Sequence, residues 1–199
     1  MTDLRETGLL PSKTSDTSRI FERQYSDILT RQMSTPSTFL QKAWGEYMRG
    51  TSALNGSVFE TLVSCLLFRN QITPIFVQTQ ITFIPNIVFD LVLYTKECGP
   101  IILSVKTSLR ERYKQADLEG MMLRQVHRKA LSYLITANEK EAISVNNKIK
   151  DGSVLGIDQV VYAFGKDMDI LIDSLTNFEY KIPPKVDMLT AKRVVTNSQ

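Results

Sequence analysis

Three runs rich in β-branched and aromatic residues follow one another between residues 72 and 108, and they constrain the fold more than any other feature. Val, Ile, Phe and Thr favour strands, and short polar breaks separate the runs. Pro74 and a polar stretch interrupt the first run, so it is expected to bend. Residues 96–100 form a plausible hairpin loop between the last two. The sequence therefore predicts strands over 72–84, 88–95 and 101–108.

Segments with the apolar spacing of helices lie on both sides of these strands. A helix, three strands, a helix and a strand follow in that order, which is typical of an α/β fold. We expect a central mixed β-sheet flanked by helices, with a small helical part before it. The predicted helices are 19–32, 39–49, 57–68, 109–129, 139–150 and 168–175, and the further strands are 131–136 and 160–164.

The composition divides the chain into three parts. Residues 1–55 form a helical N-terminal segment, residues 56–182 the core, and residues 183–199 a tail. Residues 1–18 are rich in Ser, Thr and Asp and are expected to be a loose arm. The tail follows Pro183 and Pro184 and offers few residues for packing.

The composition also excludes several classes of protein. Of the 199 residues, 43% are hydrophobic and 23% charged, which excludes a wholly disordered chain. No run of about 18 apolar residues could span a membrane, and the polar N-terminus is not a signal peptide. Cys65 and Cys98 have no paired spacing, so neither a zinc site nor a disulfide framework is indicated. A cytoplasmic protein is expected.

Two charged residues interrupt the apolar strands. Asp90 lies within one predicted strand, and Lys106 follows Ser104 by two positions in the next, so Ser104 and Lys106 share a face. If the hairpin turns about Glu97, the numbers of any two residues that face each other across the strands add up to 194. Asp90 then lies across from Ser104. A carboxylate and a lysine then meet at the open end of a strand pair. A simple salt bridge at the rim of the sheet is the alternative.

Further charges favour chemistry on a phosphate. Glu60 lies in the helix before the first strand, and Glu119 comes 13 residues after Lys106. Carboxylates around a lysine can hold Mg²⁺ against a phosphate and activate a water. Residues 105–130 carry seven basic and three acidic side chains, which suits the same ligand. A solvated helix face would also explain that segment.

These residues resemble a known superfamily of nucleases. Glu60, Asp90, the Ser-Val-Lys triplet at 104–106 and Glu119 are similar to the motif of the PD-(D/E)XK nuclease fold. Serine two residues before the lysine, with a glutamate about a dozen residues after it, resembles the CC/GG-recognising SsoII/EcoRII/NgoMIV group of type II restriction endonucleases. Residues 105–120 look most like the SsoII-like members. The resemblance covers about residues 56–136, and Phe89 replaces the proline that often precedes the aspartate.

The resemblance implies a role for each site residue. Asp90 and Glu119 would bind Mg²⁺, directly or through water, and Glu60 would be an outer ligand or hydrogen-bond partner. Lys106 would orient or activate the attacking water and stabilise the transition state. Ser104 would fill the position that an acid holds in most of the superfamily.

The resemblance also implies a substrate and an assembly. It implies a restriction-endonuclease-like core that hydrolyses double-stranded DNA as a homodimer, because a two-fold symmetric site calls for a two-fold enzyme. The implied site is CCNGG, CCWGG or CCGG-like, cut to leave 5′ overhangs, in a restriction–modification system of a prokaryotic cytoplasm. Residues 1–55 would contact DNA or dimerise. Another nuclease of this fold, acting in repair or on junctions, and a non-cleaving DNA-binding protein are the alternatives.

An Arg-Glu-Arg triplet begins the predicted helix over 109–129. Ser108 and Glu111 form a capping-box pattern, but Arg110 and Arg112 oppose the dipole of a helix's first turn. Arginine can donate two bonds to guanine, and glutamate can accept from cytosine. The triplet is therefore predicted to read G·C pairs, as the resemblance also implies for Arg110, Glu111 and Arg112. A solvated helix cap is the alternative.

The N-terminal segment contributes weaker candidates. Arg49 could contact DNA from the minor-groove side. Trp44 and Tyr47 are expected in the core or an interface more than on a base-stacking surface. Some enzymes of the resembled group flip a base into an aromatic pocket, for which Tyr25, Phe39 or Trp44 could serve.

Overall fold

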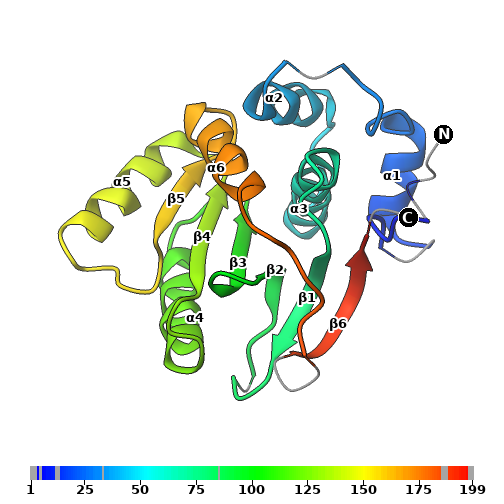
Figure 1. The fold of residues 1–199 in the computed structure, drawn as a ribbon. Helices are drawn as coiled ribbons and strands as arrows, with labels where there is room; N and C mark the ends of the chain where they lie inside the picture. The colour runs from blue at the N-terminus through cyan, green and yellow to red at the C-terminus, as the bar shows by residue number, and fades with distance from the viewer. Residues whose placement is uncertain are drawn as a thin grey trace.

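A six-stranded mixed sheet forms the centre of the protein (Figure 1). The computed structural model describes residues 4, 6–11, 14–32, 34–84, 86–184 and 188–196. The strand order is β5-β4-β3-β2-β1-β6, in which β3, β4 and β5 are parallel and β6, β1, β2 and β3 antiparallel. The strands are β1 (Ile75–Ile81), β2 (Phe89–Thr95), β3 (Gly99–Lys106), β4 (Leu131–Thr136), β5 (Gln159–Tyr162) and β6 (Met188–Val195).

Helices cover both faces of this sheet, which confirms the predicted α/β fold. The helices are α1 (Asp16–Gln24), α2 (Pro36–Glu46), α3 (Ser52–Arg69), α4 (Arg112–Val126), α5 (Glu139–Lys150) and α6 (Lys166–Thr176). Alternate strand residues point to opposite faces. One set packs against α1, α2, α3 and α6, and the other packs against α4 and α5.

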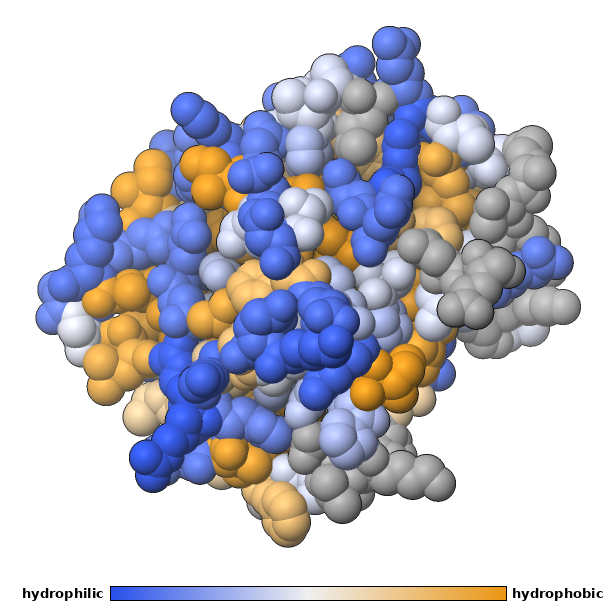
Figure 2. Space-filling model, viewed as in Figure 1, coloured by the Kyte–Doolittle hydropathy of each residue, from blue (hydrophilic) through white to orange (hydrophobic). Residues whose placement is uncertain are grey.

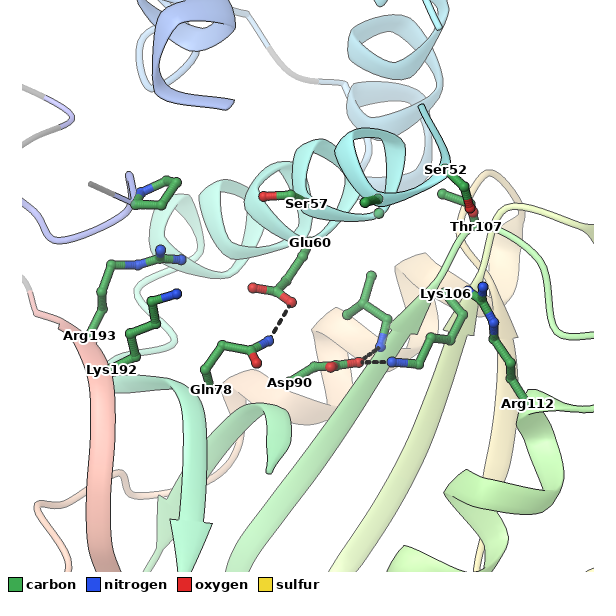
Figure 3. A pocket seen from close by; sticks show the side chains of 14 residues that line it. Ser52, Ser57, Glu60, Gln78, Asp90, Lys106, Thr107, Arg112, Lys192 and Arg193 are labelled. Carbon is green, nitrogen blue, oxygen red and sulfur yellow. Dashed lines mark hydrogen bonds and ion pairs between the residues drawn. The ribbon is translucent and has the colours of Figure 1, made fainter. Parts of the chain in front are cut away.

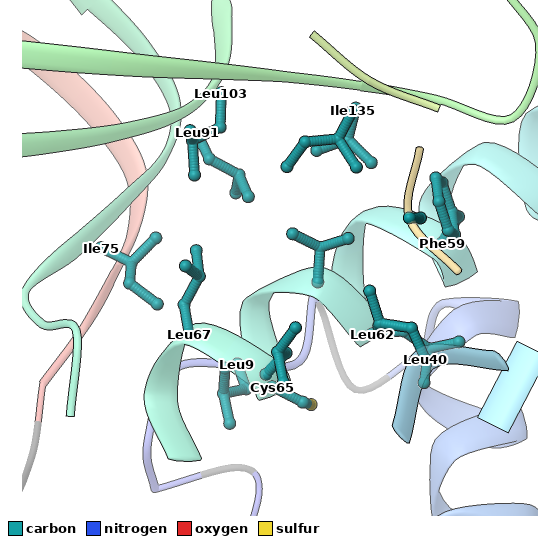
Figure 4. Close-up of a cluster of buried hydrophobic side chains, with 14 of the residues drawn as sticks. Leu9, Leu40, Phe59, Leu62, Cys65, Leu67, Ile75, Leu91, Leu103 and Ile135 are labelled. Atoms are coloured by element: carbon teal, nitrogen blue, oxygen red, sulfur yellow. The ribbon is translucent and has the colours of Figure 1, made fainter. Parts of the chain in front are cut away.

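Helix α3 is the centre of the larger core. Figure 4 shows its Phe59, Leu62 and Leu67 among the buried side chains that also include Leu91 and Leu103 of the sheet. Both faces of α3 are apolar because the sheet lies on one side and α1 and α2 on the other. The helix is longer than the predicted 57–68, since it begins at Ser52. This burial fixes the helix that carries Glu60.

The outer surface in the view of Figure 1 is mostly hydrophilic, as Figure 2 shows. Apolar patches interrupt it, among them some on the side where α5 is drawn. Ile143 is an exposed apolar side chain of that helix. Scattered exposed apolar residues are ordinary on a globular protein.

Cys65 and Cys98 are both free thiols.

The two ends of the chain differ most from the sequence prediction. The segment after Pro183 and Pro184 was expected to have little to pack, but β6 pairs with β1 along the edge of the sheet. The N-terminal arm was expected to be loose, but Leu9 is fully buried and α1 already begins at Asp16. Each end supplies the other with a packing partner, because Gly8 lies against the backbone of Val194 in β6.

Helix α4 packs closely against the backbone of the loop around Gly156, and this contact supports a stability prediction. A Cβ atom on Gly120 would lie 2.0 Å from the carbonyl oxygen of Gly156. We expect Gly120→Ala to lower the free energy of unfolding by about 1–3 kcal/mol or more, because the clash is with backbone that must shift. Urea unfolding followed by circular dichroism measures this change.

Gly45→Ala is the matched control, since a Cβ there has nothing within 4 Å. It replaces a helical glycine in open space, so it should raise stability by about 0.5–1 kcal/mol. Equal stability of the Gly120→Ala variant and the wild type would contradict the close packing of α4.

Candidate active site

A cavity of about 530 Å³ lies between α3 and the ends of the central strands. Figure 3 shows side chains from α3, β1, β2, β3, β6 and α4 pointing into it. We call this cavity the cleft. Its lining is rich in charged residues of both signs: Glu60, Asp90, Lys106, Arg112, Lys192 and Arg193.

Asp90 and Lys106 form an ion pair inside the cleft. Lys106 Nζ lies 2.7 Å from Asp90 Oδ2, and the Val105 backbone N–H donates to the same oxygen at 2.9 Å. The predicted register is confirmed, because Leu91 opposes Leu103 and the paired numbers sum to 194. Both side chains are mostly buried, so their attraction is weakly screened by water. The strand pairing thus holds a carboxylate and an ammonium group together in the cleft.

Ser104 lies beneath this ion pair. It is buried, beside Leu134 of the parallel strand β4, and does not line the cleft. A carboxylate there would be desolvated, whereas a hydroxyl group is cheaper to bury. The acidic groups near the cleft therefore come from elements other than β3.

Glu60 points from the middle of α3 into the cleft. Gln78 Nε2 donates a hydrogen bond to Glu60 Oε2 at 2.9 Å. The pKa of Glu60 is raised to about 7, chiefly by burial and then by the negative charge of Asp90, against the lowering effect of Arg193, the Gln78 bond and Lys106. The carboxyl group of Glu60 therefore exchanges its proton near neutral pH.

Glu119 lies on α4, close enough to feel the same charges. Gln115 Nε2 donates to Glu119 Oε1 at 2.7 Å. Burial raises the pKa of Glu119, the Gln115 bond and Lys106 lower it, and Asp90 raises it. Glu119 does not line the cleft, so it is a neighbour of the Asp90–Lys106 pair and not part of the cleft wall.

The carboxylates of this region suit a hard divalent cation. Asp90 raises the pKa of both Glu60 and Glu119, so negative charge accumulates at one place. Within the described ranges, no three His, Cys, Asp or Glu side chains are placed to surround an ion. Mg²⁺ commonly uses only one or two carboxylates and keeps several waters, so this donor set fits it.

Helix α4 begins later than the capping pattern predicted. Its first residue is Arg112, and the residue before it, Glu111, makes no side-chain capping bond, so the predicted Ser108–Glu111 capping box is wrong. Glu141 of α5 takes its place: its carboxylate accepts from the backbone N–H groups of Leu109 at 2.6 Å and Arg110 at 3.3 Å. The backbone donors before α4 are therefore bound by an acid from another helix.

The arginines of the triplet point to different places. All three residues of the triplet are exposed; Arg112 lines the cleft, whereas Arg110 and Glu111 lie outside its lining. Arg110 has a positive φ of 41°, a conformation that turns the chain sharply before α4. Glu111 forms an ion pair with Lys114, which lowers the pKa of Glu111. The triplet is thus displayed at the start of α4, beside the cleft.

A second cavity of about 510 Å³ adjoins the cleft, since Thr107 lines both. Trp44 and Arg49 lie in its wall, and the Arg49 guanidinium is 3.9 Å from the centre of the Trp44 ring. Arg49 Nη1 also donates to the backbone carbonyls of Trp44 at 2.7 Å and Tyr47 at 2.8 Å. Arg49 is exposed, and these contacts hold its guanidinium group in one place.

The aromatic residues of the N-terminal segment are buried. Trp44 and Tyr47 both belong to the core, as expected. Tyr25 is fully buried and donates its hydroxyl to the Ala43 carbonyl at 2.7 Å, and Phe39 is buried nearby. Of the three candidates for a base pocket, Trp44 lines the second cavity.

Sequence reasoning missed the cleft cations Lys192 and Arg193 and the hydrogen-bond partner of Glu60, Gln78. Gln78 has a positive φ of 51° within β1, and no sequence pattern marks that turn of the backbone. Lys192 and Arg193 lie in the segment expected to be a tail. The run of β-branched residues after them, Val194 and Val195, was the available signal for a strand.

The six-stranded mixed sheet and its covering helices define a restriction-endonuclease fold. Among solved structures, it is similar to the restriction endonuclease PspGI in complex with substrate DNA, with a TM-score of 0.57 and 16% sequence identity over 84% of each chain. The sequence matches no protein-family model and no curated protein. None of the described helices is long and apolar enough to cross a membrane.

The raised pKa of Glu60 predicts how stability depends on pH. The folded protein holds the Glu60 proton more tightly than the unfolded chain, so this contribution is complete below about pH 4.5 and is lost as the pH rises through about 7. We expect the metal-free protein to lose up to about 3 kcal/mol of unfolding free energy across this range. Glu60→Gln should remove most of this loss.

Urea unfolding at pH 5 and pH 8 tests this prediction in the presence of a chelator. Glu119 contributes in the same direction, so a small dependence should remain in the variant. The exposed Glu6→Gln serves as the control and should retain the wild-type loss. If Glu60→Gln showed the same pH dependence of stability as the wild type, the raised pKa of Glu60 would be contradicted.

Proposed function

We propose that this protein is a type II restriction endonuclease that hydrolyses double-stranded DNA with Mg²⁺. The observation that carries the proposal is the Asp90–Lys106 ion pair, 2.7 Å apart, inside a cleft that also holds Glu60 and further cations. The similarity of the fold to a restriction endonuclease solved with its substrate DNA supports it. Cations along the cleft suit the phosphates of a nucleic acid.

Each residue of the site has a chemical task in this proposal. Asp90 and Glu119 hold Mg²⁺, directly or through water, and Glu60 is an outer ligand or hydrogen-bond partner. Bound Mg²⁺ supplies Lewis-acid polarisation of the scissile phosphate. Lys106 orients the attacking water and stabilises the negative charge that grows on the phosphate, as a fixed cation in a partly buried site can. Ser104 keeps the position beneath them uncharged.

The triplet at the start of α4 reads the DNA. Arg110 and Glu111 are exposed and face outward from the fold, so they can reach base edges in the major groove. Arg112 lines the cleft, where its guanidinium can contact a base edge or a neighbouring phosphate. Arg49, exposed and held over Trp44, contacts the DNA from the neighbouring cavity.

The proposed assembly follows from the symmetry of the substrate. A palindromic CC/GG-containing site of the CCNGG, CCWGG or CCGG type calls for a homodimer, in which each subunit cuts one strand and leaves a 5′ overhang. Residues 1–55 contact DNA or form part of the dimer. The cellular setting is a restriction–modification system in a prokaryotic cytoplasm.

Digestion of unmethylated phage DNA with Mg²⁺, followed by sequencing of the fragment ends, tests this function. We expect discrete fragments whose ends share one CC/GG-containing motif. Asp90→Ala and Lys106→Ala should each lower the cleavage rate by at least about 100-fold, because each removes a group that acts on the transition state. Both variants should still bind the duplex in a gel-shift assay.

Lys150→Ala, at the far end of α5, is the control and should cut at the wild-type rate. Circular dichroism checks that Asp90→Ala and Lys106→Ala are folded. A smear of fragments would indicate a nonspecific or structure-selective nuclease of the same fold. Binding without cutting by the wild type would indicate a non-cleaving DNA-binding protein.

The triplet supports a separate prediction about specificity. Arg110→Ala and Arg112→Ala should each lose about 1–3 kcal/mol of discrimination at a G·C pair, because a bidentate contact to guanine is removed. The measurement is kcat/KM on duplexes with single G·C to A·T changes. Arg128→Ala, in the exposed turn after α4, should leave the discrimination unchanged. Wild-type specificity in both triplet variants would make the triplet a structural turn only.

A further inference from the structure

Two cations of the cleft have no individual role in the function proposed above. Lys192 and Arg193 extend from the edge strand β6 toward Glu60, as Figure 3 shows. They line the same cavity as Asp90 and Lys106 but come from the opposite side of it. Their presence extends the positive charge of the cleft beyond the site of cleavage.

One donor of the Arg193 guanidinium has no hydrogen-bond partner within the described part of the chain. Its Nε atom is buried and makes no hydrogen bond there. Burial lowers the pKa of Arg193, while the charge of Glu60 acts through space to raise it. A guanidinium carries five N–H donors, and leaving one buried and unpaired is costly. The side chain is therefore arranged for an acceptor that comes from outside.

Packing on both sides holds β6 in position. On its inner side it pairs with β1 through most of its length. On its outer side a Cβ atom on Gly8 would lie only 2.4 Å from the Val194 carbonyl oxygen, so the N-terminal segment packs tightly against it. The backbone that carries the two basic residues is thus fixed before any ligand arrives, which lowers the entropy cost of binding.

The strand register fixes how far these cations lie from the cleavage site. Val77 opposes Leu91 in β2 and Arg193 in β6, so residues 90, 78 and 192 lie in the next row across the sheet. Lys192 is therefore two strands from Asp90, a distance of about 10 Å at the usual strand spacing. That span suits a ligand with repeated negative charges, because one small anion at Asp90 could not reach β6.

We propose that Lys192 and Arg193 form a binding subsite for a backbone phosphate of the DNA strand, within a few nucleotides of the phosphate that is cut. The inference rests on the proposed nuclease function and adds a contact to it. The phosphate accepts hydrogen bonds from the Arg193 guanidinium, and the positive charge of Lys192 attracts it. Because the contact is to phosphate, it adds affinity without reading sequence.

The salt dependence of DNA binding tests this subsite. Fluorescence anisotropy with a labelled duplex, without divalent metal, gives the slope of log K against log salt concentration between 50 and 200 mM NaCl. Each lost phosphate contact should reduce the magnitude of this slope by about 0.9. Because the two residues share one phosphate, the double variant should show this reduction, and Lys192→Gln and Arg193→Gln should each show part of it. Arg193→Lys keeps the charge and should largely restore the slope.

Lys129→Gln combined with Lys150→Gln is the matched control, since it removes two exposed cations at the opposite end of the sheet and should keep the wild-type slope. Thermal unfolding confirms that each variant is folded, and Lys192→Gln, on an exposed side chain, tests the subsite if Arg193→Gln does not fold. Unchanged slopes in the folded variants would falsify the subsite.

Further outcomes separate the subsite from the nuclease function. If the wild type cuts DNA but the variants keep its slope, the subsite fails alone. If the wild type binds but does not cut, and the variants lower the slope, the nuclease function fails and the subsite stands. If the wild type does not bind DNA, both fail. Stabilisation by inorganic phosphate that the variants lose, with an unchanged DNA slope, would assign the cations to a free anion and overturn the proposal.

Discussion

The antiparallel pairing of β2 with β3 is the constraint on which the candidate site depends. It places Asp90 beside Lys106, so that Asp90 Oδ2 accepts from Lys106 Nζ at 2.7 Å and from the Val105 backbone N–H at 2.9 Å. A slip of one residue would move one of these side chains to the opposite face of the sheet, because the side-chain period of a strand is two. The buried residues Leu91 and Leu103 oppose such a slip, since each would leave the core around α3. The hydrophobic core therefore fixes the polar geometry.

Charge in the cleft is organised by partial burial. Glu60 and Glu119 both have a raised pKa because water is partly excluded and because Asp90 is near. Lys106 offsets part of this repulsion through its ion pair with Asp90. The arrangement leaves acidic oxygens for a cation in the centre and basic groups on either side for an anion. In the proposed function, a substrate phosphate with a divalent cation supplies both.

Local patterns predicted the centre of the molecule but misjudged its edges. The strands around Asp90 and Lys106 are marked by composition, and the hairpin register follows from a short loop. The start of α4 was mispredicted because Glu141, 30 residues beyond Glu111, binds the backbone N–H groups of Leu109 and Arg110, and the helix begins only at Arg112. Strand β6 was missed because its pairing partner, β1, lies more than 100 residues earlier in the chain.

The sequence by itself determined the order of the central elements, the opposition of residues in the β2–β3 hairpin and the kinds of side chain that meet there. These depend on contacts between residues close together in the chain, which periodicity and turn chemistry specify. Only the tertiary structure decided that Glu60 meets Gln78, that Arg112 turns into the cleft while Arg110 does not, and that Lys192 and Arg193 complete its far side. Those contacts join distant segments, and their positions follow from how the helices and the edge strand pack on the sheet, which no local pattern records.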